Sequence, residues 1–400
     1  MLKVLQETSS ISVTSVAPEE MDDAVMADWQ RLFEAQPTPS NPFLSPIWVQ
    51  HWYRNFVPSA DRRVVLVRRR TGDSPPGELM GIAPMYVNRR RLGPARLVDR
   101  MLPAGAGVGS NPYEIPGLLC DGDHVREVTK AVTSACLGVA VDWCELPLAP
   151  HQSWFDWDWL KSSTAGTTFG EEVRTRACVI LPLQPSWPET RTTLKRNIKE
   201  SIRRSANRLK KDGRSWEVVR RGADLDSAAV ERFLHLHRVR SRLGQGASQH
   251  PDAYAQVEHR GLMIGALPQL GREGQASMFE LYLDGEHVAS QLGLHSPGTS
   301  YVHSSGFRED TWELGVVTHL QAELIRYAID RGDSVVNFSP GPSVSKLRWS
   351  ERLWVTHEFA FGAGPRSLPL RFSAFQAISV FKTLRQAAAR HQEHLSRRTG

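Results

Sequence analysis

The stretch at residues 275–351 constrains the fold most, because its hydrophobic period changes from strand-like to helical and back. In chain order we expect three strands, a helix and a fourth strand at 276–283, 286–295, 299–305, 316–331 and 335–338. The turns Asp284-Gly285 and Ser296-Pro297-Gly298 separate the first three strands, as in tight hairpins. Apolar residues recur at helical spacing in the fourth run. The stretch therefore predicts an α/β unit.

The loop at 306–315, just before the expected helix, is the first candidate for ligand binding. It has a glycine at each end, Gly306 and Gly315, and it contains Arg308. A helix N-terminus exposes unpaired N–H groups and a partial positive charge, so a pyrophosphate can bind there. Taken alone, a glycine-bounded loop more often indicates an ordinary turn. Taken with the strand order around it, the loop favours phosphate binding.

Three other segments carry a family resemblance. After the fourth strand, Asn337-Phe338-Ser339 is followed by Lys346. Near the start the chain reads Asn41-Pro42-Phe43-Leu44-Ser45-Pro46, and a basic helix begins around Lys195-Arg196-Asn197-Ile198. With the element order, these motifs resemble the acyl-CoA-binding core of the GNAT N-acyltransferases. More narrowly, they are similar to the CelD/BcsL-like, FemAB-related branch found near bacterial exopolysaccharide genes. That branch usually has an aspartate where this chain has Asn337, so no carboxylate role carries over to this position.

The resemblance implies an α/β fold with two GNAT-like halves, each a mixed central sheet flanked by helices. We expect an N-terminal half at 1–170, an acyl-CoA-binding half at 171–365 and a basic C-terminal helix at 366–400. The implied reaction moves an acyl group from acetyl-CoA or another acyl-CoA to an amine or hydroxyl, with no covalent enzyme intermediate. Such a reaction needs a phosphate-binding site, hydrogen-bond donors near the thioester oxygen, and a base.

Candidate site residues follow from the resemblance and from the chemistry that it implies. His237, Glu280 and His303 are alternative bases, and a histidine with its ordinary pKa near 6.5 suits that role. Asn337 and Lys346 are expected to orient the acceptor or the thioester. The residues expected to bind the cofactor are Ser305, Gly306, Arg308, Gly315 and Val316. Those expected to contact the acceptor are Tyr113, Glu114, Arg196 and Arg240.

Aromatic residues form two groups in the N-terminal part of the chain. Trp48, Trp52 and Phe56 recur at four-residue spacing, which predicts one buried helix face. A second group at 154–159 contains three tryptophans, which serve either as a sugar- or lipid-binding platform or as a cap on the core. The acceptor candidates Tyr113 and Glu114 lie between these groups, in a glycine-bearing loop at 103–116 that is expected to line a pocket.

The segment 191–214 is the most basic part of the chain. It contains ten Lys or Arg residues against Glu200 and Asp212, and its apolar residues fall on one helical face. The whole chain carries a net charge of +6, which favours anionic partners. An anionic substrate, a membrane surface and RNA all fit such a helix, and so does a simple solvated face.

Composition excludes several classes of protein. No run of eighteen apolar residues is present, so no membrane-spanning helix is expected. The four cysteines form no CxxC pair and read as buried residues in a reducing cytoplasm. His287, His295 and His303 are evenly spaced, but no carboxylate or cysteine recurs with them, so no metal site is predicted. A cytoplasmic protein is expected, with contact to the inner face of the membrane as an additional hypothesis.

Three rival functions stay open beside acyl-CoA-dependent transfer to a small-molecule, sugar or polysaccharide-related acceptor. The first is a FemAB-type enzyme that takes an aminoacyl group from tRNA, using the basic segment 191–214. The second is a non-catalytic, membrane-associated binding protein for polysaccharide assembly. The third is a degenerate GNAT fold kept for interactions. Bound CoA in the purified protein would separate acyl-CoA-dependent transfer from the rest.

Overall fold

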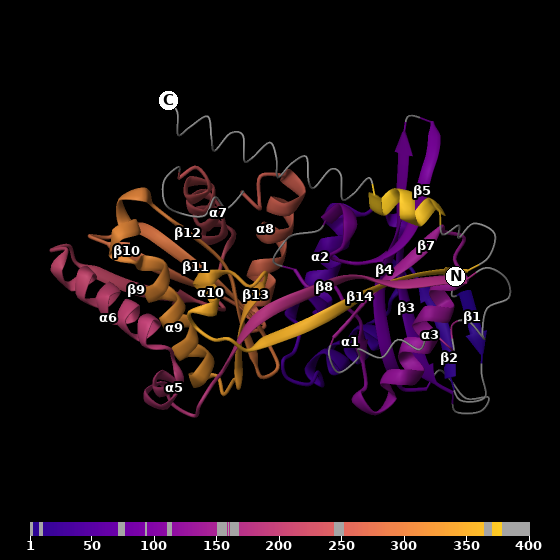
Figure 1. The fold of residues 1–400 in the computed structure, drawn as a ribbon, viewed down its shortest axis with the longest axis horizontal. Coiled ribbons are helices and arrows are strands. Elements are labelled where there is room, and N and C mark those ends of the chain that lie inside the picture. Colours follow the sequence, from indigo (N-terminus) through magenta and orange to yellow (C-terminus); the bar gives the residue numbers. More distant parts are fainter. Residues whose placement is uncertain are drawn as a thin grey trace.

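One continuous sheet runs through the whole molecule (Figure 1). The fold is that of a computed structural model describing residues 3–7, 11–70, 77–92, 94–109, 114–149, 158, 160, 168–243, 252–363 and 370–377. The described strands form a 14-stranded sheet in the order β1-β2-β3-β4-β5-β7-β14-β8-β13-β12-β11-β10-β9, with β6 paired to β4. The order divides the sheet into an N-terminal half, from β1 to β7, and a C-terminal half, from β13 to β9.

The elements of the N-terminal half are β1 (Lys3–Glu7), β2 (Ile11–Val16), α1 (Asp23–Glu34), α2 (Pro46–Phe56), β3 (Arg62–Arg69), β4 (Leu79–Leu92), β5 (Ala95–Pro103), β6 (Leu119–Cys120), α3 (Val125–Leu137) and β7 (Trp143–Leu148). Those of the C-terminal half are β8 (Thr168–Pro182), α5 (Trp187–Thr193), α6 (Arg196–Lys211), β9 (Trp216–Arg221), α7 (Ser227–Ser241), α8 (Val257–Arg272), β10 (Ala276–Leu283), β11 (Glu286–Ser296), β12 (Thr299–Phe307), α9 (Val316–Asp330), β13 (Val335–Pro340), α10 (Val344–Leu347) and β14 (Leu353–Ala363).

The two halves repeat one order of elements. In the N-terminal half the chain runs β2-α1-α2-β3-β4-β5-α3-β7, and in the C-terminal half β9-α7-α8-β10-β11-β12-α9-β13. Each half ends with a helix that returns the chain to a parallel strand, β5 beside β7 and β12 beside β13. The prediction of two GNAT-like halves with mixed sheets is therefore confirmed, and the strand and helix positions expected at 275–351 agree closely with β10 to β13.

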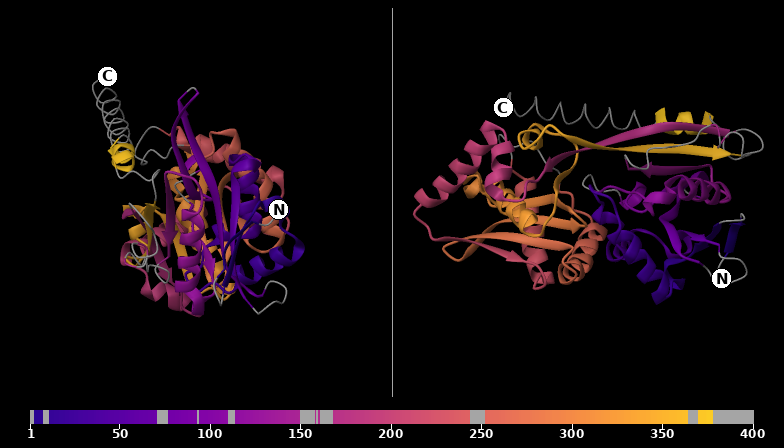
Figure 2. Two further views of the ribbon diagram at one scale, coloured as in Figure 1. Left: turned by 90° about the vertical axis from the view of Figure 1, so that its right-hand side faces the viewer. Right: turned by 90° about the horizontal axis from the view of Figure 1, so that it is seen from below.

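Two long strands join the halves. β8 and β14 run antiparallel side by side across the molecule, and β14 also pairs with β7 of the N-terminal half (Figures 1 and 2). The predicted boundary between 170 and 171 thus falls inside β8, near its start. Because these strands cross the boundary, the halves are parts of one hydrogen-bonded sheet.

The halves also share a hydrophobic core. Trp29, Trp48 and Trp52 are buried from the N-terminal half, and they belong to one cluster with Phe233 and Tyr301 of the C-terminal half. The prediction that Trp48 and Trp52 form a buried helix face is confirmed. Of the tryptophan group at 154–159, all three tryptophans lie outside the described residues.

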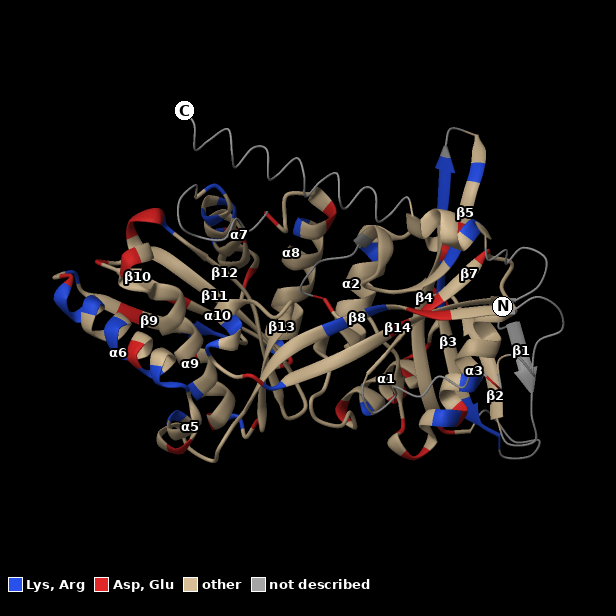
Figure 3. Cartoon of the chain, viewed as in Figure 1, with Lys and Arg blue, Asp and Glu red and all other residues tan. Residues whose placement is uncertain are grey.

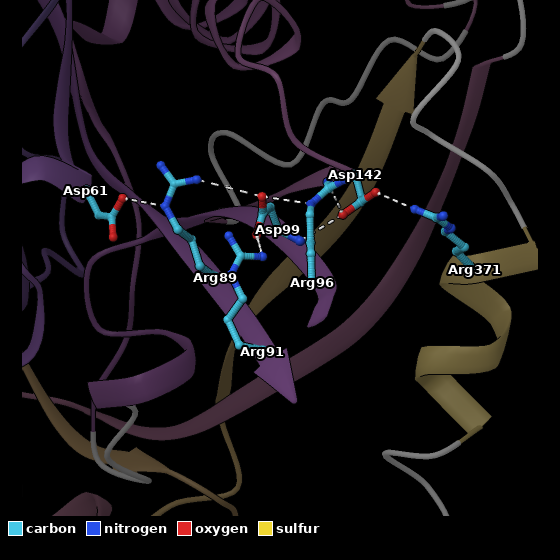
Figure 4. A network of polar contacts seen from close by, with 7 residues as sticks. All are labelled: Asp61, Arg89, Arg91, Arg96, Asp99, Asp142 and Arg371. Carbon is cyan, nitrogen blue, oxygen red and sulfur yellow. Dashed lines mark hydrogen bonds and ion pairs between the residues drawn. The ribbon is translucent and has the colours of Figure 1, made fainter. Parts of the chain in front are cut away.

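An ion-pair network surrounds the seam between β5 and β7 (Figure 4). Asp142, just before β7, is buried and accepts hydrogen bonds from Arg96 (2.7 Å), from Arg371 (3.2 Å) and from the backbone N–H of Asp99 (2.7 Å). Asp99 in turn pairs with Arg91 at 3.1 Å. The network fastens the start of the C-terminal helix to the sheet. Residues 370–377 of that helix are described, and the rest of the predicted range 366–400 lies outside the described residues.

Two elements differ from the sequence-based expectation. A run of three arginines, as at 89–91, is typical of a strand end, whereas β4 continues through it into a hairpin with β5. α8 extends to Arg272 although Gly265 and Pro268, two residue types of low helix propensity, lie inside it. A side chain at position 265 would lie 2.6 Å from the His51 ring of α2, so glycine permits close helix packing there. Tertiary packing thus overrides the local helix propensity.

Candidate active site

The site forms where β12 and β13 separate. The two strands pair in parallel over three positions, Thr299 to Tyr301 with Val335 to Asn337, and β12 then continues to Phe307 without this neighbour. At the point of divergence Ser339 has a left-handed backbone (φ 62°), and its N–H donates to the Asn337 side-chain oxygen at 2.8 Å. The Ser339 hydroxyl donates to Val302 O at 2.9 Å. Asn337 therefore fixes the turn that opens the sheet.

A cavity of about 690 Å³ lies beside this opening. It is bounded by the open part of β12, the start of α9, one face of α6, and α10 with the residues that follow it. Its charged and polar lining residues are Arg208, Arg240, Gln291, His303, Ser304, Ser305, Glu313, Thr318, Gln321, Ser343, Ser345, Lys346 and Arg348. The cavity has the volume of a small-molecule or cofactor site.

The helix start at α9 opens into the cavity. Gly315, Val316 and Thr318 line it, and Gly315 is the N-cap with a left-handed backbone (φ 73°) and no side-chain capping bond. A Cβ at position 315 would lie 3.2 Å from the Ser205 Cβ of α6, so glycine serves both the turn and the close approach of two helices. The predicted phosphate-binding helix start, with Gly315 and Val316, therefore faces the cavity.

Three cations around the cavity interact with neutral oxygens. The Lys346 ammonium donates to the backbone oxygens of Ser339 (3.0 Å) and Pro340 (2.7 Å). Arg348 donates to the hydroxyl of Ser201, and Arg208 to the backbone oxygen of Glu313. Within the described residues, no carboxylate forms an ion pair with any of the three. The Lys346 pKa falls to about 8 because burial disfavours its charged form.

One wall of the cavity joins β12 to α7. Arg240 donates to the Ser305 backbone oxygen (3.0 Å) and hydroxyl (2.7 Å), and its guanidinium lies 5.4 Å from the centre of the Phe307 ring. His237 Nδ1 lies 3.0 Å from the Ser305 oxygen, and its Nε2 accepts from the Ala253 N–H at 3.4 Å. Both ring nitrogens of His237 thus meet backbone groups, an arrangement that fixes the ring more than it favours proton abstraction.

His303 lies deeper in the same wall. Burial lowers the His303 pKa to about 3, with a smaller contribution from nearby His237 and Lys346. The ring is therefore neutral at pH 7, but a conjugate acid of that pKa makes it a weak base. Tyr254, from the segment before α8, completes this wall through its hydroxyl, which lies 2.7 Å from the Ser304 hydroxyl.

Three predicted residues, Glu280, Arg308 and Arg196, do not line the cavity. Glu280 is buried on β10 and held by Arg221 (2.5 Å), Arg232 (3.1 Å) and Tyr282 (3.0 Å), so its charge is already compensated. Arg308 pairs with Asp310 and Glu286 outside the cavity. Arg196 is 93 % exposed beside Glu200. These positions correct the expectation that they share one site with Lys346, because each carboxylate or guanidinium has a partner elsewhere.

Gly306 and Asn337 serve the architecture of the site. Gly306 belongs to β12, not to a phosphate-binding loop, and a Cβ there would lie 2.4 Å from the His237 backbone nitrogen. It therefore allows α7 to pack closely on the strand. Asn337 is buried and holds the turn at Ser339, as described above.

Of the two acceptor candidates in the N-terminal half, the structure describes only Glu114. Tyr113 lies outside the described residues. Glu114 is buried, and burial raises its pKa well above the ordinary value. Its Oε2 has no hydrogen-bond partner within the described structure. Glu114 does not belong to the lining of the cavity at β12, so its role as an acceptor contact stays a prediction.

Sequence reasoning missed Arg208, Arg348 and Tyr254. Arg208 belongs to the basic segment that was recognised, but its position toward the cavity depends on how α6 packs on α9. Arg348 lies two residues after Lys346, and the Lys346-Leu347-Arg348 spacing was a usable signal. Tyr254 carries no motif. Among the described residues, no group of His, Cys, Asp and Glu could hold a metal ion, and no helix could cross a membrane.

Two parallel strands that part beside a helix start are the arrangement that the resemblance to the GNAT acyltransferases implies. Residues 196–347 match the family model of the acetyltransferase (GNAT) domain. The chain also has the fold of FemX, at a TM-score of 0.56 and 10 % identity, over 84 % of this chain and 95 % of that one. The fold is therefore GNAT-like and FemAB-related. No curated protein matches the chain.

Two more distant solved structures are similar in outline. The C-terminal domain of a putative lysylphosphatidylglycerol synthetase from Agrobacterium fabrum has a TM-score of 0.47 and 10 % identity, over 88 % of this chain and 95 % of that one. A tandem GNAT protein from the clavulanic acid biosynthesis pathway has a TM-score of 0.40 and 10 % identity, over 89 % of this chain and 99 % of that one. At these scores neither likeness adds to the argument.

Proposed function

We propose that the protein transfers an acyl group from acyl-CoA, such as acetyl-CoA, to an amine or hydroxyl of a small-molecule or saccharide acceptor. The observation that carries the proposal is the cavity at the strand opening, which is lined by a helix start and by four cations, Arg208, Arg240, Lys346 and Arg348. Lys346, Arg208 and Arg348 interact there with neutral oxygens alone among the described residues. A ligand with several phosphate charges would supply the missing counter-charge.

The donor would bind with its phosphates toward Arg208, Arg348 and the N-terminus of α9. Helix N–H groups and guanidiniums both favour phosphate oxygens. The thioester would then extend along the open edge of β12 toward Lys346. This orientation assigns the exposed cations to the phosphates and the more buried cation to the reacting group.

Lys346 is the proposed stabiliser of the transition state. The acceptor atom bonds to the acyl carbon, the C–S bond breaks, and the CoA sulfur leaves as a thiol once the acceptor's proton reaches it. Negative charge develops on the carbonyl oxygen during this step, and a nearby ammonium stabilises it. With a pKa of about 8, Lys346 is mostly protonated at pH 7. The base is not assigned, because His237, His303 and Glu280 each have geometry or charge that disfavours the role.

Calorimetry with acetyl-CoA tests the donor site. The double variant Arg208→Gln, Arg348→Gln should weaken acetyl-CoA binding by about tenfold or more, since each charged hydrogen bond contributes roughly 1.5–3 kcal/mol. The matched control is Arg308→Gln, whose guanidinium pairs with Asp310 and Glu286 outside the cavity. Affinity that is unchanged in the double variant, or equally reduced in the control, would refute this donor site.

A second candidate is an aminoacyl-tRNA-dependent, FemAB-type transferase. α6 is rich in Lys and Arg (Figure 3), and its Arg208 lines the cavity. The fold is also similar to that of FemX. Incubation of the purified protein with acetyl-CoA and with aminoacyl-tRNA in parallel separates the two. Acyl transfer from tRNA alone would favour the second candidate. A role in exopolysaccharide synthesis and a location at the inner face of the membrane remain predictions from the sequence.

A further inference from the structure

A second recess lies beside the cavity, between the end of α7 and the start of α8. It has a volume of about 360 Å³ and is lined by Arg238, Ser241, Arg242, Asp252, Tyr254, Ala255 and Arg260. We call it the arginine recess. Three of its seven lining residues are arginines and one is an aspartate, so the recess is strongly cationic.

Within the part of the chain that the structure describes, the three arginines have no acidic partner, unlike several other arginines of this half. Arg221 and Arg232 both pair with Glu280, and Arg214 pairs with Asp212. Among the described residues, no carboxylate forms an ion pair with Arg238, Arg242 or Arg260, although Asp252 lines the same recess. The Asp252 carboxylate accepts a hydrogen bond from the Tyr254 N–H at 3.0 Å. The positive charge in the recess is thus left for an external anion.

Helix electrostatics explain two of these arginines but not the third. Arg238 and Arg242 lie at the C-terminal end of α7, where cations stabilise the helix dipole. Arg260 lies in the first turns of α8, near the positive end of that helix, where a cation is unfavourable. Its position therefore indicates a role other than helix stabilisation.

The wall of the arginine recess meets that of the proposed donor cavity at Tyr254. Tyr254 lines the recess, and its hydroxyl lies 2.7 Å from the hydroxyl of Ser304, which lines the cavity. On α7, Arg240 lies in the cavity wall and its neighbours in the helix, Arg238 and Arg242, lie in the recess. The recess and the cavity therefore adjoin the same part of α7, and Tyr254 links their walls.

We propose that the arginine recess binds an anionic group of the acyl acceptor, a phosphate or a carboxylate, and so directs the acceptor's amine or hydroxyl toward the thioester. This proposal rests on the proposed acyltransferase function, because only that function makes the bound molecule an acyl acceptor. Guanidinium groups match both oxyanions through paired hydrogen bonds. The acceptor class is therefore anionic amines or alcohols.

Binding of inorganic phosphate to the full chain tests the recess. Because the donor cavity also attracts phosphate, the measurement uses a background with Arg208→Gln, Lys346→Met and Arg348→Gln. Adding Arg238→Gln, Arg242→Gln and Arg260→Gln to this background should lower phosphate affinity by about tenfold or more. The matched control is Arg272→Gln, an exposed arginine in the last turn of α8, which should leave phosphate affinity unchanged.

The outcomes separate this proposal from the function on which it rests. Unchanged phosphate affinity in the recess variant, or an equal loss in the Arg272 control, would overturn the recess. Acetyl-CoA binding that persists in the recess variant of the otherwise native chain supports two separate sites. If acetyl-CoA fails to bind the native chain while the recess still binds phosphate, the donor assignment fails and the anion site stands.

A parallel titration with acetate, followed by competition between amines, identifies the anion. The amines are phosphoethanolamine, β-alanine and ethanolamine, which differ in carrying a phosphate, a carboxylate or neither. Either of the first two should bind more tightly than ethanolamine by about tenfold, and the recess variant should remove the preference. Equal binding of all three amines to the native chain would contradict the proposed acceptor class.

Discussion

The seam between β5 and β7 and the seam between β12 and β13 occupy the same place in the two halves, yet their charges are arranged in opposite ways. At the first seam, Asp99, Asp142 and Glu145 compensate the surrounding arginines, and Arg371 joins them from the C-terminal helix (Figure 4). At the second, Lys346 and the arginines around the cavity meet neutral oxygens within the described structure.

This difference contrasts a closed seam with an open one. Arg100 at the first seam bonds to Glu145 (2.9 Å) and lies over the Phe375 ring at 4.7 Å, so the C-terminal helix covers it. Because the charges in this network are paired with one another, they need no ligand to compensate them. At the second seam the strands part after three paired positions and a cavity of about 690 Å³ opens. Uncompensated cations beside a cavity are unfavourable in the unliganded protein, which is typical of a binding site.

The largest expected effect concerns Lys346. Lys346→Met should lower kcat by roughly 10²–10³-fold, as expected when a donor to a developing oxyanion is removed. The native rate should be sustained below about pH 8 and fall as pH rises through the Lys346 pKa, since only the protonated amine stabilises the charge. The methionine variant should lack this alkaline fall. A pH–rate profile with an unchanged alkaline limb in the variant would exclude Lys346 from the chemistry.

Removing a charged side chain should change the free energy of unfolding in opposite directions at the two seams. Asp142→Asn removes a buried charge that accepts from Arg96, Arg371 and the Asp99 N–H, and should lower the free energy of unfolding by about 2 kcal/mol. Lys346→Met removes a partly desolvated cation, and should leave stability unchanged or increased. Denaturant unfolding measures both. A stable Asp142 variant or a strongly destabilised Lys346 variant would contradict the difference between the two seams.

Much of this difference between the two seams could not be predicted from the sequence. Periods and turns at 275–351 located β10 to β13 closely, and a resemblance located Gly315, Val316, Ser305, Arg240, His303 and Lys346, which all line one cavity. The sequence did not reveal which charged residues find partners. Glu280 and Arg308 looked as available as Lys346, but their partners Arg232 and Glu286 come from other elements. Partner choice across a sheet depends on strand order and register, which local patterns do not encode.

The smallest expected effect concerns α6, an element of the C-terminal half that lies outside the repeated order of elements. It is rich in Lys and Arg (Figure 3). The exposed Arg196 and Arg204 flank Glu200. Exposed ion pairs of this kind contribute less than about 1 kcal/mol. Replacing Lys199, Arg203 and Arg204 by Glu should therefore leave the melting temperature nearly unchanged. Binding to anionic vesicles or to tRNA should fall if α6 meets an anionic partner.

A control with equal charge makes this last prediction specific. The triple replacement in α6 takes the net charge from +6 to zero, and so does replacement of Arg54, Arg90 and Arg272 by Glu elsewhere on the surface. If both variants lose binding equally, the partner responds to overall charge and α6 has no particular role.

If the α6 variant alone loses binding to tRNA, the aminoacyl-tRNA-dependent candidate gains support. Loss of vesicle binding alone would instead favour membrane contact. Retention of both would leave α6 as a solvated face over the apolar residues Ile198, Ile202 and Leu209, which bury its other side.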